Sequence, residues 1–260
     1  YPSAAKLWQI AAAAQATVFG TSPGFLERSE DDGLRPAADY DLSRLRIIGS
    51  TGAPLLSRSF EYLHDNFPEV PVFSTSGGTD VVGPFVTGTV TAPVWSGEIP
   101  VRALGIAAEV WDESGRPVED RVGELVITQP MPSMPLRLWN DPDGVKLRDT
   151  YFSYFPGYWR QGDWATVTSR QTVIVHGRSD ATLNRNGVRL GPADIYQIVE
   201  AIPDIQEGLV VGVDNPDGTY WMPLFVSLRP GVTFGSELEQ MIGERIARLL
   251  SPRHRPDAII

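Results

Sequence analysis

Residues 46–54 read RIIGSTGAP and residues 70–80 read VPVFSTSGGTD, and these two stretches decide the interpretation of the fold. Each begins with a short apolar run and ends in glycine and hydroxyl-bearing residues, which is typical of a buried strand followed by a loop. Residues 57–67, which lie between them, are predicted to form a helix. Strands that alternate with helices predict a parallel sheet, so we expect both loops at the same edge of one sheet.

The alternation extends toward the N-terminus and changes toward the C-terminus. Residues 3–16 are rich in alanine and are predicted to form a helix, with a strand at 17–20. From 84 to 176, short apolar runs alternate with Gly, Pro and Asp, and residues 112–117 (DESGRP) are a hairpin signal. This part is therefore expected to be antiparallel β structure.

A third pattern begins after Asp180. The elements expected there are helices at 192–202 and 237–250 and strands at 208–213 and 223–228. They make a compact α+β unit within the usual size range of small domains. We therefore predict an α/β plus α+β fold, with residues 1–179 as the C-terminal part of a large domain and residues 180–260 as a small, truncated domain.

Composition narrows the classes of function. Of the 260 residues, 42% are hydrophobic and 21% charged, which is ordinary for a globular protein, and no apolar run reaches the roughly 18–20 residues of a membrane span. The net charge of -10 argues against a broad nucleic-acid surface. The absence of cysteine excludes disulfides, thiolate metal sites and a cysteine nucleophile, and it is consistent with a reducing cytoplasm.

Two loops of small residues are candidates for binding an anion. Residues 74–80 follow a predicted strand, so backbone N–H groups and hydroxyls there can approach a phosphate, and Asp80 could hold Mg²⁺. The alternative is a plain Gly/Ser loop in which Asp80 caps a helix. Residues 49–54 are similar; alone they indicate only a turn, but beside the first loop they would line the same crevice.

Two further segments carry polar side chains that could bind a ribose or a phosphate. Asp163 lies in a glycine turn between aromatic residues, where its carboxylate could accept paired hydrogen bonds from a ribose or simply cap the turn. Residues 177–191 concentrate arginines in an otherwise acidic protein, which favours phosphate binding over a solvated hairpin. The histidines at 64, 176 and 254 are scattered, so we interpret them as structural.

The order of five short motifs carries a family resemblance. Ser-Thr-Gly-Ala-Pro, Gly-Gly-Thr-Asp, Gly-Glu-Leu (123–125), Trp-Arg-x-Gly-Asp and Gly-Arg-Ser-Asp follow one another as in the acyl-CoA synthetases of the adenylate-forming superfamily. Each motif is weak alone, but the ordered set is specific. Longer stretches, at 138–144, 151–157, 177–191 and 250–254, are most similar to the branch of the family that activates acetoacetate.

The resemblance implies a nucleotide site. The positions that would contact the nucleotide are Gly52, Ala53, Pro54, Thr75, Thr79, Asp163, Arg178 and Arg189. The first three would border the adenine, the two threonines would contact the phosphate, and Asp163 would hold the ribose hydroxyls. Arg178 would reach the ribose or the phosphate, and Arg189 matches a phosphate-contacting arginine.

Other positions would serve the metal, coenzyme A and the acyl group. Thr79 and Asp80 would lie at the catalytic centre. Asp80 stands where the family usually has a magnesium-binding Glu. Asp180 matches the hinge of the small domain, and Asn186 and Gly187 lie where coenzyme A would approach. Gly77 aligns with a bulky Trp of acetyl-CoA synthetases, so a glycine there would leave room for a longer acid such as acetoacetate.

The implied activity is ligation of acetoacetate, or a similar short acid, to coenzyme A through an acyl-AMP intermediate with ATP and Mg²⁺. The family's phosphate loop is expected before Tyr1 and its catalytic lysine after Ile260, so the chain alone is expected to be inactive. Three alternatives stay open at this point: another acyl- or aryl-CoA ligase, a nucleotide-binding module without full activity, and a purely structural domain.

Overall fold

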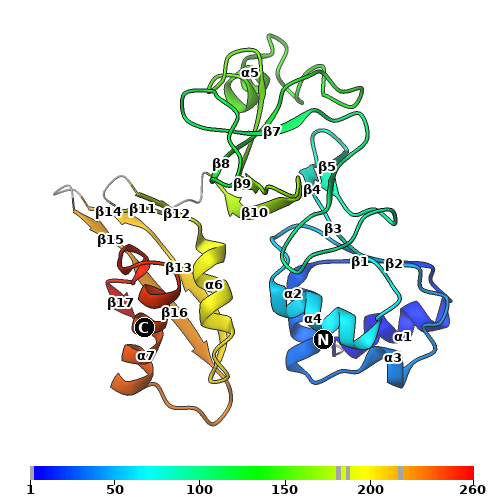
Figure 1. The fold of residues 1–260 in the computed structure, drawn as a ribbon, viewed down its shortest axis with the longest axis vertical. Helices are drawn as coiled ribbons and strands as arrows, with labels where there is room; N and C mark the ends of the chain where they lie inside the picture. The colour runs from blue at the N-terminus through cyan, green and yellow to red at the C-terminus, as the bar shows by residue number, and fades with distance from the viewer. Residues whose placement is uncertain (1–2, 180–182, 186–187, 216–218) are drawn as a thin grey trace. The chain divides into compact units, whose positions relative to one another are not determined.

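The computed structural model describes residues 3–179, 183–185, 188–215 and 219–260 (Figure 1). Two compact units make up the chain, Tyr1–Val175 and His176–Ile260. The boundary predicted from the sequence lies a few residues further along, at Asp180, which is outside the described residues. Each unit is described by itself below.

A three-stranded parallel sheet forms the N-terminal part of the first unit (Figure 1). Its strands, in the order β1-β2-β3, are Val18–Thr21, Ile47–Ser50 and Val72–Ser74. The helices of this part are α1 (Ala5–Ala13), α2 (Pro23–Asp31), α3 (Pro36–Asp39) and α4 (Ser57–Asn66). The predicted parallel strands and the helix between β2 and β3 are thus confirmed, whereas α2 and α3 were not predicted.

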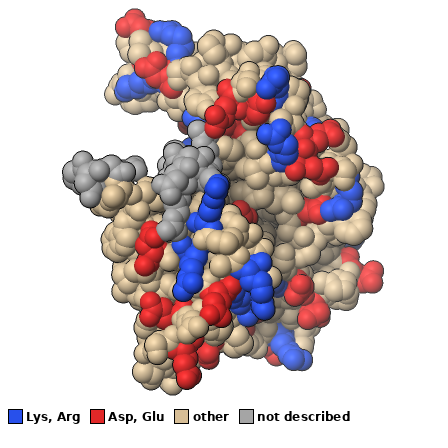
Figure 2. Space-filling model, turned by 60° about the vertical axis from the view of Figure 1, so that its left-hand side comes forward, with Lys and Arg blue, Asp and Glu red and all other residues tan. Residues whose placement is uncertain are grey.

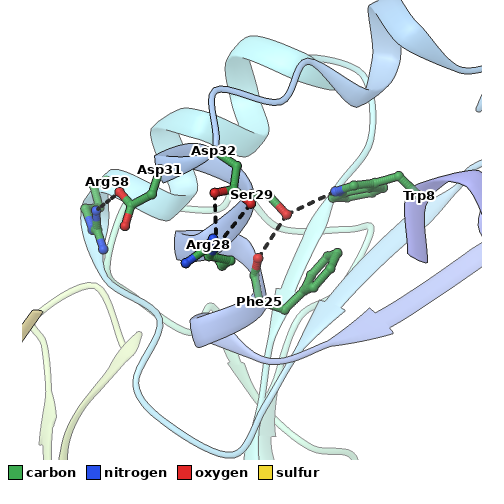
Figure 3. Close-up of polar contacts among 7 residues, drawn as sticks. All are labelled: Trp8, Phe25, Arg28, Ser29, Asp31, Asp32 and Arg58. Atoms are coloured by element: carbon green, nitrogen blue, oxygen red, sulfur yellow. Dashed lines mark hydrogen bonds and ion pairs between the residues drawn. The ribbon is translucent and has the colours of Figure 1, made fainter. Parts of the chain in front are cut away.

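Aromatic and aliphatic side chains hold these helices to the sheet. Trp8 of α1 is fully buried and stacks against Phe67 beyond α4, with ring centroids 5.7 Å apart. Its indole N–H donates to the hydroxyl of Ser29 in α2 at 3.1 Å, and that hydroxyl donates to the carbonyl of Phe25 at 2.9 Å (Figure 3). On the outer side of α2, Arg58 of α4 pairs with Asp31 at 3.4 Å.

Antiparallel sheets build the rest of the first unit, as predicted. One sheet has the order β4-β5-β6, with strands Ser76–Gly78, Gly83–Thr87 and Val101–Arg102. The other has the order β10-β9-β8-β7, with strands Val173–Arg178, Trp159–Val167, Gly123–Ile127 and Ala108–Trp111. A short helix that was not predicted, α5 (Val145–Tyr151), packs against β9, and Trp159 lies in the core beneath it.

The second unit is an α+β arrangement around its own core. Its strands are β11 (Leu183–Arg185), β12 (Val188–Leu190), β13 (Ile205–Val210), β14 (Val213–Asp214), β15 (Tyr220–Trp221), β16 (Pro223–Leu228) and β17 (Ala258–Ile259). Its helices are α6 (Pro192–Glu200), α7 (Ser236–Leu249) and the short 3-10 turn Pro252–His254. Apolar residues of α6 and α7 at helical spacing, such as Ile195 and Ile242, are fully buried, as their pattern predicted.

Charged residues are interspersed on the surface. On the face shown in Figure 2, Lys and Arg side chains alternate with Asp and Glu and do not form one continuous basic area.

Among the described residues, no helix combines the length and the apolar character needed to cross a bilayer.

Candidate functional site

The loops that follow β2 and β3 meet at the carboxyl edge of the parallel sheet. The Thr51 hydroxyl donates to the carbonyl of Thr75 at 2.9 Å, and the Thr75 amide donates to the carbonyl of Ser50 at 2.9 Å. Gly52 has a φ of 98°, which favours glycine, and it is exposed together with Ala53. The predicted neighbourhood of the two loops is therefore confirmed.

A hairpin carries the Gly-Gly-Thr-Asp motif away from this edge. Strand β4 (Ser76–Gly78) pairs with β5, and the turn between them begins with Thr79 and Asp80, both of which are exposed. The Thr75 hydroxyl lies 3.0 Å from that of Thr87 at the end of β5, which links the hairpin to the parallel sheet. Thr75, Thr79 and Asp80 thus follow one another along a single supported loop.

Gly77 lies where the two strands of this hairpin approach each other closely. A Cβ at this position would lie 2.2 Å from the Gly83 carbonyl oxygen and 2.7 Å from the Cα of Pro84. Both atoms belong to the partner strand β5, so a side chain there would push the strands apart. A side chain at Gly77 would therefore point at the main chain of β5, and the assignment of Gly77 to an acyl pocket stays a prediction.

Asp163 lies next to the hairpin although it is far away in the sequence. It belongs to β9, is 7% exposed, and its Oδ2 accepts a hydrogen bond from the Ser76 hydroxyl at 3.2 Å. Two positions before it, the Gln161 side chain donates to the carbonyl of Gly77 at 3.3 Å. Strand β9 and strand β4 are therefore joined at two points, and the ribose and phosphate candidates share one part of the first unit.

Asp80 has a partner that the motifs did not identify. The hydroxyl of Tyr151, at the end of α5, donates to Asp80 Oδ2 at 2.6 Å. The Tyr151 ring stacks on Trp159, with centroids 3.6 Å apart and an interplanar angle of 13°. Residues 151–157 carried part of the family resemblance, but periodicity gave no sign of α5, and the contact depends on how that helix packs.

The remaining candidates lie in the second unit or outside the described residues. Arg178 is exposed at the end of β10, a strand that begins in the first unit and ends in the second, and Arg189 belongs to β12, whose backbone pairs with β11 through Asn184. Asp180, Asn186 and Gly187 fall outside the described residues.

The histidines of the second unit contact neighbouring polar side chains. His176 Nδ1 lies 3.3 Å from Asp194 Oδ1, and His254 Nδ1 lies 2.8 Å from the Ser251 hydroxyl. Within the described part of the chain, no group of three or more His, Cys, Asp or Glu residues could hold a metal ion. These contacts are consistent with the structural interpretation of both residues.

The fold of the chain is shared with a solved structure. No protein-family model matches the chain. The anthranilate CoA ligase AuaEII, in a complex with anthranoyl-AMP, is 19% identical with a TM-score of 0.82, and the match covers 98% of this chain and 48% of that protein. At this identity the likeness concerns the fold alone, which this chain shares with that CoA ligase.

Nearer relatives are acetoacetyl-CoA synthetases. The acetoacetyl-coenzyme A synthetase of Rhizobium meliloti (strain 1021) is 44% identical over 260 residues, which are 100% of this chain and 40% of that enzyme. The structure of acetoacetyl-CoA synthetase from Streptomyces lividans is 48% identical with a TM-score of 0.89, over 100% of this chain and 40% of that chain. Over its whole length the chain is therefore similar in sequence and fold to acetoacetyl-CoA synthetases, and it spans 40% of the length of these relatives.

Proposed function

We propose that the chain is part of an enzyme that ligates acetoacetate, or a similar short acid, to coenzyme A with consumption of ATP. The observation that carries this proposal is the match of the entire chain to acetoacetyl-CoA synthetases at 44% and 48% identity. The contact between Asp163 and Ser76 supports it, because it unites two motifs that the nucleotide site would need.

In the first half-reaction, the carboxylate of the acid attacks the α-phosphorus of ATP, and the bond to pyrophosphate breaks. The protein contributes positioning and electrostatic stabilisation, and no protein nucleophile is required. We assign Asp163 to the ribose hydroxyls, because a carboxylate can accept both as charge-assisted hydrogen bonds. Thr75 and Thr79 are assigned to the phosphate, and the Gly52–Pro54 loop to the adenine.

Mg²⁺ is the proposed companion of ATP, and Asp80 is its proposed ligand. Protein sites for nucleotide-bound Mg²⁺ use one or two carboxylates together with phosphate oxygens and water. An exposed carboxylate on a loop that is held by neighbouring side chains fits this requirement, even without a cluster of acids. The ion would offset the negative charge that develops on the phosphates.

In the second half-reaction, the thiol of coenzyme A attacks the acyl carbon, its proton is lost and AMP departs. We assign Asp180 to the hinge about which the residues after it rotate between the half-reactions. Asn186 and Gly187 are assigned to coenzyme A, and Arg178 and Arg189 to the nucleotide. Because ATP and coenzyme A are cytoplasmic substrates, we propose the cytoplasm as the location.

The test is acid-dependent release of pyrophosphate by the full-length protein, followed by AMP release on addition of coenzyme A. A panel of acetate, acetoacetate, butyrate and benzoate is expected to give the highest kcat/KM with acetoacetate. A higher value with another acid would identify a different acyl-CoA ligase, and nucleotide binding without pyrophosphate release would identify a binding module. If the protein neither binds nucleotide nor releases pyrophosphate, the ligase assignment is contradicted altogether.

A further inference from the structure

We propose that Tyr151 is a positioning residue for Asp80, a role that rests on the proposed ligase function. The hydroxyl of Tyr151 donates to Asp80 Oδ2 at 2.6 Å, within the range of a charge-assisted O–H···O⁻ hydrogen bond. The two residues come from different elements, α5 and the β4–β5 turn. A carboxylate on an exposed turn thereby gains a fixed partner from outside its own hairpin.

The ring of Tyr151 is itself held in place. It stacks nearly parallel on Trp159, which is 1% exposed and belongs to the core of this part of the unit. The Trp159 indole N–H donates to Gln161 Oε1 at 3.1 Å, and the Gln161 amide donates to the Gly77 carbonyl at 3.3 Å. Besides the Asp163–Ser76 contact, strand β9 therefore supports the hairpin at the Gly77 backbone and, through Tyr151, at the Asp80 side chain.

The other end of α5 is also fixed. Asp141 is 5% exposed and accepts hydrogen bonds from the backbone amides of Lys146 and Leu147, each at 3.0 Å. These amides belong to the first turn of α5, where backbone N–H groups have no partner inside the helix. The helix is thus held at its start by Asp141 and at its end by the stacked Tyr151.

This arrangement has a functional consequence for Asp80. The hydrogen bond to Oδ2 fixes the orientation of the Asp80 carboxylate. Without it, a short side chain on an exposed turn would sample several orientations. Outer partners that orient a metal-binding carboxylate typically change metal affinity or activity by about 10- to 100-fold when they are removed. Tyr151 would therefore affect the Mg²⁺ dependence of nucleotide binding without touching the nucleotide.

The experiment removes only the hydroxyl, in the full-length protein. Tyr151→Phe keeps the ring that stacks on Trp159, and Tyr158→Phe is the matched control, because Tyr158 packs edge-on against Trp111 at 4.8 Å. Two quantities are measured: ATP affinity against Mg²⁺ concentration, without acid, and kcat and KM for pyrophosphate release. Each is repeated in an Asp80→Ala background.

We expect Tyr151→Phe to raise the half-saturating Mg²⁺ concentration and lower kcat by about tenfold. Tyr158→Phe should behave as the unaltered protein, and Tyr151→Phe should add no further loss once Asp80 is alanine. Equal behaviour of the two Tyr→Phe variants, or an equal loss with and without the Asp80 carboxylate, would overturn the inference while leaving the ligase function intact. If the unaltered protein binds Mg²⁺ and ATP but releases no pyrophosphate, the proposed function fails, and the binding data still decide the role of Tyr151. If it binds no ATP, both fail.

Discussion

Ser76 and Asp163 are 87 positions apart in the sequence, yet the Ser76 hydroxyl donates to Asp163 Oδ2 at 3.2 Å. Asp163 is 7% exposed on β9, and Ser76 begins the strand that leads to Thr79 and Asp80. The contact sets the orientation of a buried carboxylate relative to the glycine-rich hairpin. It therefore ties the proposed ribose contact to the proposed phosphate loop.

The first prediction concerns these two side chains. Asp163→Ala in the full-length protein should weaken ATP binding by about 10- to 100-fold, because hydrogen bonds to a charged group contribute about 1.5–3 kcal/mol. Ser76→Ala removes one hydrogen bond to the Asp163 carboxylate but leaves the carboxylate in place, so it should weaken ATP binding less, by about threefold. Calorimetric titration with ATP checks both values. A larger effect from Ser76→Ala than from Asp163→Ala would contradict the assignment.

The second prediction follows from the geometry of Gly77. Gly77→Ala should destabilise the protein by about 1–3 kcal/mol, the usual cost of overpacking, because its Cβ would meet the backbone of Gly83 and Pro84. Gly24, a helical glycine in α2 with nothing within 4 Å of the Cβ position, is the matched control. Gly24→Ala should stabilise by about 0.5–1 kcal/mol, since alanine favours a helix over glycine. Urea unfolding of both variants distinguishes a strand contact from an open pocket: a neutral Gly77→Ala would mean that the space exists.

Periodicity predicted the elements that bury several apolar residues at regular spacing. Helices α6 and α7 repeat apolar residues every three or four positions, and β2 carries a fully buried Ile48, so both the type and the position of these elements followed from the sequence. Helix α2 was missed because all of its residues after Leu26 are charged or polar, and its burial depends on Leu26 joining the core and on Ser29 meeting Trp8.

The candidate site could be predicted only in part, for a similar physical reason. The alternation of strands and helices placed the loops after β2 and β3 together, because the carboxyl ends of parallel strands share an edge. The role of Gly77 depends on the register of β4 against β5, which no local pattern specifies. Helix α5 has only 7 residues and buries none of them fully, so it is too short for its periodicity to be detected, and its Tyr151 reaches Asp80 through tertiary packing.

The third prediction concerns pH. Burial lowers the pKa of His254 below its usual 6.5, and the nearby charge of Asp194 opposes that shift. The folded state thus favours the neutral imidazole, so the unfolded chain takes up the proton first as the pH falls. The contribution of neutral His254 to the free energy of unfolding should be fully present above about pH 6.5. It should decline as the pH falls from there through the pKa of the folded state. Urea unfolding between pH 5 and 7.5, compared with His254→Gln, checks the sign: the variant should lose part of this slope, and an identical slope would exclude His254 as its source.

The last prediction compares two serines that are both fully buried. The Ser29 hydroxyl accepts the indole N–H of Trp8 at 3.1 Å, whereas the Ser59 hydroxyl in α4 has no hydrogen-bond partner among the described residues. Ser29→Ala leaves the buried indole N–H without its acceptor, so it should destabilise the protein by about 1–3 kcal/mol. Ser59→Ala removes a buried hydroxyl that makes no hydrogen bond to compensate for its burial, and alanine favours the helix more than serine does. The substitution should therefore be neutral or stabilise the protein by about 0.5 kcal/mol. Equilibrium urea unfolding, followed by the fluorescence of tryptophan, measures both. Equal destabilisation by the two variants would mean that loss of volume, not the hydrogen bond to Trp8, sets the cost; opposite signs would establish that the α1–α2 contact depends on this one hydroxyl.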